Sequence, residues 1–222
     1  MIFARTTFAT ALAGTALAAL SALPAVAHPH VFAEARLDVA VNPDNTVKAL
    51  KHLWRFDDVF SSTVLIEFDA NSDLKLDDAE LQEVANTVYT SLAEYDYFQL
   101  VTQDKKDVAM KPPAKLIATF EDQQLIIMFE SEPKEALKLG GQVDFGVYDP
   151  TFYTAIDFVE DDYMQVQNMP AGCTRAVIRP DPDEAIAQNQ DMLDQSFWDT
   201  TSSNDMQKLF ATRLEITCKG LG

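Results

Sequence analysis

Apolar and polar residues alternate along two neighbouring stretches of the chain, and this alternation constrains the fold more than any other feature. The first stretch covers residues 31–41 and the second covers residues 47–56. A period of two is typical of a strand with one buried face. Residues 42–45 (NPDN) between them are turn formers. The sequence therefore predicts an antiparallel hairpin, with the turn centred on Asp44.

Two segments after the hairpin follow a helical pattern. Residues 57–68 (DDVFSSTVLIEF) and residues 77–95 (DDAELQEVANTVYTSLAEY) each begin with acidic residues, and the second carries apolar side chains at helical spacing. A loop rich in carboxylates separates them. We expect a helix-loop-helix insert at about residues 57–95.

The rest of the chain is mostly β in pattern. Strands are predicted at residues 98–102, 115–120, 125–129, 143–148, 154–159, 174–178 and 212–218, with a helix at 183–197 and a polar loop at 199–205. We expect mainly antiparallel pairing, because no helices are available for parallel crossovers. The predicted fold class is α+β: one domain, residues 28–222, with a mainly antiparallel sheet, an EF-hand-like insert and a tethered C-terminal strand.

The first 27 residues have the features of a secretory signal. Arg5 precedes an apolar run from residue 8 to residue 23, and Ala25-Val26-Ala27 is a small-x-small cleavage sequence. The apolar run is shorter than a membrane-spanning helix. We expect cleavage after Ala27 and export, most simply to a bacterial periplasm.

The chain has two cysteines, Cys173 and Cys218. In an exported protein such a pair predicts one disulfide. Its role would be to hold the C-terminal strand against the main body.

The net charge is strongly negative, with 35 acidic and 17 basic residues and a formal charge of -18. A surface of this sign repels phosphate backbones and anionic lipid, which argues against nucleic-acid binding and peripheral membrane attachment. Cations are the natural partners of such a chain.

The carboxylate-rich loop has the ligand spacing of an EF-hand calcium loop. The six ligand positions of the twelve-residue loop are filled by Asp69, Asn71, Asp73, Lys75 (through its carbonyl), Asp77 and Glu80. Position 6, normally Gly because the backbone has positive φ there, is Leu74, and this should cost about 1 to 2 kcal/mol. The alternative is a loop that keeps the helix-loop-helix shape without an ion, held by Asx-type hydrogen bonds.

A second candidate metal site lies at the predicted new terminus. After cleavage, His28 would offer both its amino group and its imidazole, and His30 lies two residues on. The hairpin places His30 opposite Asp58 and His52 opposite Arg36. We therefore expect Asp57 or Asp58 as a third ligand, in a set that suits zinc and also fits nickel or cobalt.

Two other interpretations of the histidines remain. The terminal pair could bind no metal. His52 is expected to be packed or hydrogen-bonded rather than a ligand, because it lies beside Trp54 in a strand and roughly 20 Å from His30. A copper histidine-brace enzyme would need His52 close to the terminus. No serine or cysteine nucleophile with a histidine base is recognisable, so we expect no enzymatic activity.

Several motifs in order resemble a known family. They are His28-Pro29-His30, residues 51–57 (KHLWRFD), residues 95–98 (YDYF), residues 147–153 (VYDPTFY) and Ala171-Gly172-Cys173. The chain resembles the exported, long-uncharacterised proteins found with nickel/cobalt-type metal permeases, which include the ZevA-like component of a bacterial zinc uptake system. Relatives tend to have Gly at the position of Leu74.

The resemblance implies a periplasmic accessory protein of divalent-metal transport. By position it assigns the metal site to His28, His30 and the Asp57/Asp58 pair, and it makes an inner-membrane permease the partner. Asp149, in the Tyr-Asp-Pro turn, is expected to form the turn rather than to bind metal. The leading hypothesis is a zinc-binding accessory protein without enzymatic activity. The alternative is an interaction domain stabilised by calcium.

Overall fold

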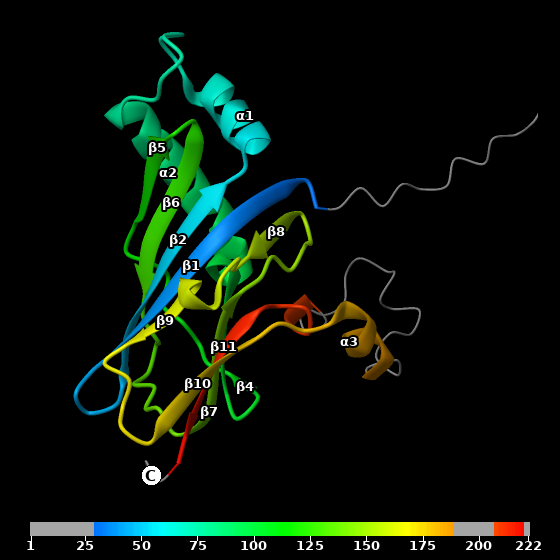
Figure 1. The fold of residues 1–222 in the computed structure, drawn as a ribbon. Coiled ribbons are helices and arrows are strands. Elements are labelled where there is room, and N and C mark those ends of the chain that lie inside the picture. The colour runs from blue at the N-terminus through cyan, green and yellow to red at the C-terminus, as the bar shows by residue number, and fades with distance from the viewer. Residues whose placement is uncertain (1–28, 189–206, 220–222) are drawn as a thin grey trace, which may run out of the picture.

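The computed structural model describes residues 29–188 and 207–219, which form two β-sheets and a pair of helices beside the first sheet (Figure 1). The first sheet has the order β5-β6-β2-β1-β8, with β9 also paired to β1, and the second has the order β10-β11-β7-β3-β4. The strands are β1 (Val31–Val41), β2 (Val47–Phe56), β3 (Gln99–Gln103), β4 (Lys106–Asp107), β5 (Leu116–Glu121), β6 (Gln124–Ser131), β7 (Gly141–Val147), β8 (Thr154–Asp157), β9 (Met164–Gln167), β10 (Cys173–Ile178) and β11 (Arg213–Cys218). The helices are α1 (Asp58–Phe68), α2 (Asp78–Leu92) and α3 (Pro182–Gln188), with 3-10 turns η1 (Ala93–Phe98) and η2 (Asp161–Tyr163). The predicted α+β class is confirmed.

The β1–β2 hairpin forms as predicted, but its register differs by one residue. His52 lies opposite Leu37 rather than Arg36, and Asp57 rather than Asp58 is paired with β1. The prediction that His30 faces Asp58 was therefore wrong. The cause is an irregularity between Ala40 and Val41 that adds one residue to the count on one strand.

Two strands of the first sheet run parallel to their neighbour. Both β8 and β9 pair with β1 in parallel. The other strand pairs are antiparallel, so the prediction of a mainly antiparallel sheet is confirmed and these two strands are its exceptions. More than a hundred residues separate β1 from β8, so this connection passes through the rest of the fold and needs no single crossover helix.

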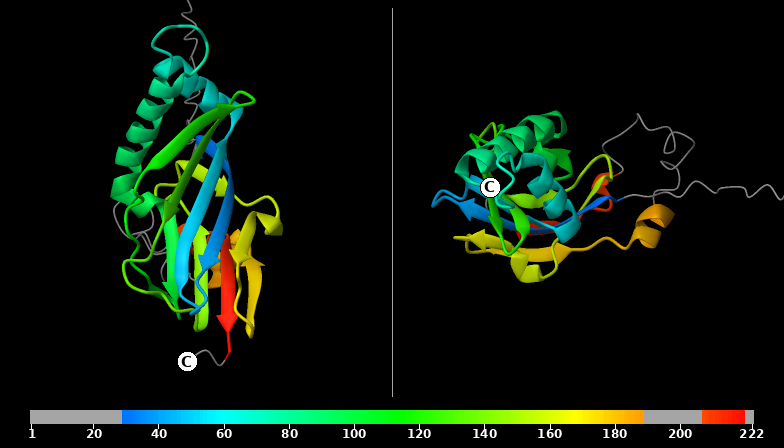
Figure 2. Two further views of the ribbon diagram at one scale, coloured as in Figure 1. Left: turned by 90° about the vertical axis from the view of Figure 1, so that its left-hand side faces the viewer. Right: turned by 90° about the horizontal axis from the view of Figure 1, so that it is seen from above.

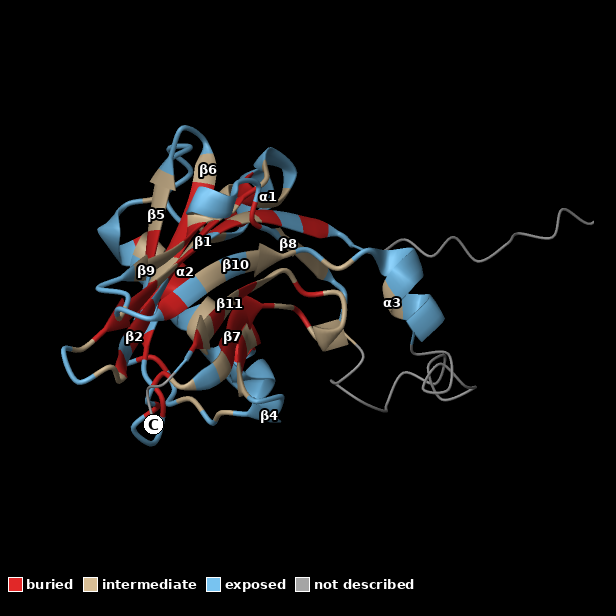
Figure 3. Ribbon diagram, turned by 60° about the horizontal axis from the view of Figure 1, so that its bottom comes forward, coloured by how far each residue is buried: buried red, intermediate tan, exposed pale blue. Residues whose placement is uncertain are grey.

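One continuous apolar core fills the interior. Trp54 of β2 stacks on Phe98 at 6.0 Å and meets Phe129 of β6 edge-on at 5.1 Å, while Phe145 of β7 and Leu214 of β11 are fully buried. Figure 2 shows α2 running alongside the strands of the first sheet, where it packs against β5. Buried residues follow β1, β2, β7 and β11, whereas α3 is largely exposed (Figure 3).

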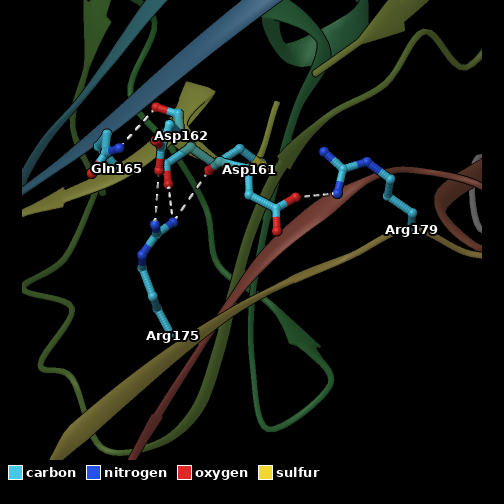
Figure 4. Close-up of polar contacts among 6 residues, drawn as sticks. Asp161, Asp162, Gln165, Arg175 and Arg179 are labelled. Carbon is cyan, nitrogen blue, oxygen red and sulfur yellow. Dashed lines mark hydrogen bonds and ion pairs between the residues drawn. The ribbon is translucent and has the colours of Figure 1, made fainter. Parts of the chain in front are cut away.

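Arginines at β10 tie the second sheet to the turn that precedes β9 (Figure 4). Arg175 donates to the carbonyls of Met164 at 2.7 Å and Asp161 at 3.3 Å, and it lies 3.6 Å from the carboxylate of Asp162. Arg179, just after β10, pairs with the Asp161 carboxylate. Because β9 belongs to the first sheet, these contacts hold the two sheets together at one edge.

The disulfide between Cys173 and Cys218 is confirmed. The two residues lie opposite each other on β10 and β11, so the bond fastens the C-terminal strand as predicted. Of the helices in residues 29–188 and 207–219, none is both long and apolar enough to cross a membrane.

Other predictions compare with the structure as follows. The helix predicted at 183–197 corresponds in its first part to α3, and its remainder lies outside the described residues, as do the 199–205 loop, the 1–27 signal and His28. The short strands β4 and β9 had no sequence signal long enough to predict them.

Candidate metal-binding sites

Asp57 lies at the junction of β2 and α1 and caps the helix. Its Oδ1 accepts the backbone N–H groups of Val59 at 2.9 Å and Phe60 at 3.0 Å. Its Oδ2 accepts the N–H of Phe32 from β1 at 2.9 Å, and the N–H of Asp57 returns a bond to the Phe32 carbonyl. Burial opposes ionisation, but these N–H donors outweigh it and hold the pKa of Asp57 below its ordinary value. The carboxylate is therefore fixed and ionised at the end of the hairpin.

His30 stands just before β1 at this same end. Its backbone N–H donates to the carbonyl of Tyr153 at 2.9 Å, and the two rings lie 5.1 Å apart. Asp57 is bonded to Phe32, two residues further along β1. The structure thus brings His30 and Asp57 to one end of the first sheet, as the hairpin predicts.

Asp58 is directed to a different neighbour. Its Oδ1 accepts a hydrogen bond from the side chain of Gln124 at 2.9 Å, and Gln124 begins β6. In the sheet, β6 and β1 lie on opposite sides of β2. The carboxylate of Asp58 is therefore held away from the His30 side, and Asp57 is the better candidate of the pair.

The second candidate site has the predicted helix-loop-helix shape. Asp69 ends α1, and Asp77 caps α2 in a capping box with Glu80. Leu74 has φ 63°, the positive value that position 6 of a calcium loop requires. Asp69 accepts the N–H of Leu74 at 2.8 Å, the side chain of Asn71 accepts the N–H of Asp73, and the side chain of Asp73 accepts the N–H of Lys75. These Asx-type bonds match the alternative interpretation of the loop.

Glu80, the last ligand position, is turned to the backbone in this structure. Its Oε1 accepts the N–H of Ala70 at 2.9 Å, and its Oε2 accepts the N–H of Asp77 at 2.8 Å. The residue is buried. Calcium would have to displace these donors before Glu80 could supply two oxygens. The loop therefore has the backbone shape of a calcium site, but Glu80 is not arranged as a calcium ligand.

Across the part of the chain that the structure describes, no three His, Cys, Asp or Glu side chains are grouped closely enough to hold a metal ion. His28 is not among those residues. Three of the predicted members of the terminal site, His30, Asp57 and Asp58, therefore lie within the described chain.

His52 is confirmed as a packed histidine. It is 3% exposed, and its ring stacks on Phe129 at 4.3 Å. Leu37, its partner on β1, is seven residues beyond His30. Within the described chain neither ring nitrogen has a hydrogen-bond partner, and burial lowers the pKa of His52 to about 3. This separation argues against a histidine brace formed with the terminus.

Asp149 forms the turn, as expected. Its carboxylate accepts the N–H and hydroxyl of Thr151, both at 2.7 Å, and the N–H of Thr154 at 2.8 Å. This turn positions Tyr153, the residue that holds His30 and that periodicity alone did not identify. Only the 147–153 motif of the resemblance pointed to it.

Two comparisons with known proteins bear on the chain. The model of a protein family described as "Protein of unknown function (DUF1007)" matches residues 13–218. The comparison with curated proteins finds no match.

Proposed function

This chain belongs to the DUF1007 family of proteins of unknown function, and from its geometry we propose that it captures a divalent metal ion, zinc first, in the periplasm and delivers it to an inner-membrane permease. The proposal rests on one observation above all. A fixed, ionised carboxylate, Asp57, and an imidazole, His30, are held at the same end of the first sheet, and in the sequence His30 follows His28 and Pro29.

The chemistry of these groups suits a metal that is handed on. Imidazole and carboxylate ligands bind zinc, and nickel or cobalt would also be accepted. Asp57 already accepts three N–H bonds, so it retains limited capacity for a metal and would contribute moderate affinity. Moderate affinity favours release to a partner.

The surroundings of the site suit contact with another protein. Phe32 is 55% exposed, Tyr153 50% and Val59 79%, and all three contact or neighbour His30 or Asp57. Exposed apolar side chains beside a binding site are typical of interaction surfaces. The permease as partner comes from the resemblance to proteins that accompany nickel/cobalt-type permeases, including the ZevA-like zinc uptake component.

The test is a zinc titration of the mature chain beginning at His28, with a chromophoric chelator as competitor. His28→Ala, His30→Ala and Asp57→Asn should each weaken zinc binding by about tenfold or more, which corresponds to about 1.4 kcal/mol. Asn is a good helix cap, so Asp57→Asn removes the charge and keeps the cap of α1.

Asp58→Asn is the matched control, because its carboxylate is held by Gln124 on the other side of β2. It should leave zinc affinity within about twofold of the unaltered protein, a difference of about 0.4 kcal/mol. Equal loss in the Asp57 and Asp58 variants would rule out the site as drawn. Unchanged affinity in all three variants at His28, His30 and Asp57 would rule out the proposed function.

A calcium-stabilised interaction domain is the second candidate, because Leu74 already has the backbone conformation that a calcium loop needs. Thermal unfolding with calcium and with zinc separates the two functions. A midpoint that rises with calcium and ignores zinc would favour the second candidate.

A further inference from the structure

A groove of about 700 Å³ lies on the outer face of the first sheet. Its floor crosses four neighbouring strands, β5, β6, β2 and β1, and the turn before β9 forms a wall. Figure 1 shows these four strands side by side, with β9 next to β1. The floor is described in full, because all residues of the four strands are described. The volume is in the range of small-molecule sites, about 300 to 1,000 Å³.

Three apolar side chains, Leu53, Met128 and Ile117, form a row across the floor, which we call the apolar row. Leu53 of β2 lies opposite Met128 of β6, and Met128 lies opposite Ile117 of β5. Arg36 of β1 lies opposite Leu53 and extends the row by one strand. The next residue along β2, Trp54, is buried in the core, so by alternation these side chains face outward. The floor is therefore apolar, with a guanidinium at one end.

The guanidinium of Arg36 is restrained by a ring. Its central carbon lies 4.0 Å from the centre of the Tyr163 ring, a cation–π contact. Tyr163 belongs to the turn η2 and lines the same groove. Among the described residues, Arg36 makes no hydrogen bond or ion pair. Its planar fork of N–H donors is suited to a carboxylate.

The other charged side chains of the floor have partners within the described chain. Glu130 of β6 lies 3.8 Å from Lys51 of β2 in an ion pair. Asp38 of β1 accepts a hydrogen bond from the amide of Gln167 at 3.3 Å. Arg36 is thus the charged group of the floor that a ligand can pair with without breaking an existing contact, and this ligand would be an anion. Because the whole chain has 35 acidic and 17 basic residues, its overall charge would not attract an anion, so the local arrangement must.

We propose that this groove binds an amphipathic anion, a carboxylate on a saturated hydrocarbon chain, with the carboxylate on Arg36 and the chain along the apolar row. Arg36 and Ile117 are three strand spacings apart, about 14 Å, which a fatty acid of about eight to ten carbons spans when extended. None of the candidate metal ligands lines the groove within the described chain, so the proposed metal function and this site stand or fall separately.

The experiment is calorimetric titration of the disulfide-bonded chain, without added metal, with octanoate, 1-octanol, butanoate and octyltrimethylammonium. Octanoate should bind saturably at one site per chain. Octanol, which lacks the charge, and butanoate, which lacks half of the chain, should each bind more weakly by about tenfold or more. Octyltrimethylammonium should not compete with octanoate.

Each ligand can overturn a part of the proposal. No saturable binding of octanoate would overturn the site. Binding of octanol or octyltrimethylammonium as tight as that of octanoate would overturn the anionic class. Binding of butanoate as tight as that of octanoate would overturn the role of the apolar row.

Two variants test the orientation of the ligand. Arg36→Gln should remove the difference between octanoate and octanol, whereas Met128→Asn should weaken both and keep the ratio of their affinities. Lys48→Gln removes a positive charge from an exposed position of β2 outside the groove, and it should bind as the unaltered chain does. Thermal unfolding of each variant without ligand confirms that it is folded. A folded Arg36→Gln chain that still prefers octanoate over octanol would contradict the assignment.

Discussion

Two titratable side chains, one in the middle of β2 and one just past its end, both have a lowered pKa. The cause of the lowered pKa differs between them. His52, in the middle, is buried with no hydrogen-bond partner among the described residues, and burial alone lowers its pKa to about 3. Asp57, just past the end of the strand, is lowered because backbone N–H donors outweigh the effect of burial. One group is held neutral by the lack of partners, and the other is held charged by three of them.

The difference shows that a lowered pKa has no single meaning for stability. The carboxylate of Asp57 stabilises the fold because its charge is bonded to α1 and to β1. The imidazole of His52 is tolerated only while it is neutral, since its charged form would be desolvated without compensation. Asp57 therefore links α1 to β1, whereas His52 makes the core less stable as the pH falls.

The largest expected effect follows from His52. The pKa in the folded chain, about 3, is below the ordinary value of 6.5. The full stability is therefore present above pH 6.5, and it is lost as the pH falls, because the unfolded chain takes up a proton that the folded chain refuses. The unfolding free energy should fall by about 1.4 kcal/mol per pH unit from this group once the pH is below about 5.5, measured by urea denaturation between pH 5.5 and 4.5.

His52→Leu is the matched variant, because it keeps an apolar contact with Phe129 and removes both unpaired nitrogens. It should flatten the pH dependence by about the same 1.4 kcal/mol per unit and should be as stable as the unaltered chain at pH 7, or more stable. A slope that is the same in both proteins would show that His52 does not control the acid response.

The next effect compares the two aspartates that cap helices. Asp57→Ala should cost about 2 to 3 kcal/mol, because it loses the cap of α1 and also the bond to Phe32 on β1. Asp77→Ala loses only local bonds within its loop and helix, and should cost about 1 to 2 kcal/mol.

Urea denaturation at pH 7 without metal measures both variants, with Asp57→Asn as a control that retains a capping side chain. Asp57→Asn should be nearer to the unaltered chain than Asp57→Ala. If Asp57→Ala costs no more than Asp77→Ala, the tie between α1 and β1 contributes nothing measurable.

The same strand shows what could be predicted from the sequence. Alternation identified the hairpin, and it also indicated that His52 is packed and that a carboxylate ends the strand near His30. It did not reveal the extra residue, Lys48, which lies between the partners of Ala40 and Val41 on β2, because Lys48 is not a Gly that would mark a bulge. This one extra residue shifts the register so that Asp57, rather than Asp58, lies beside β1.

Contacts between distant segments were the least predictable. The pairing of β1 with β8 depends on residues more than a hundred positions away, and local periodicity carries no information about such partners. Arg36, Leu53 and Met128 lay within predicted strands. Their alignment in one row across the sheet could be identified only once the pairings of β1, β2 and β6 were known.

The smallest effect concerns the backbone strain at Leu74. Its φ of 63° is costly for a residue with a Cβ, and its side chain is 76% exposed, so little packing would be lost on replacement. Leu74→Gly should stabilise the chain by about 0.5 to 1 kcal/mol, the relief of strain being partly offset by the greater freedom of Gly when unfolded. Leu74→Ala keeps the Cβ and should bring no such gain. Urea midpoints measured with and without calcium compare the two variants. A gain in the stability of Leu74→Gly that grows with calcium would identify the loop as a calcium site. An equal gain in both conditions would identify the loop as a structural turn between α1 and α2.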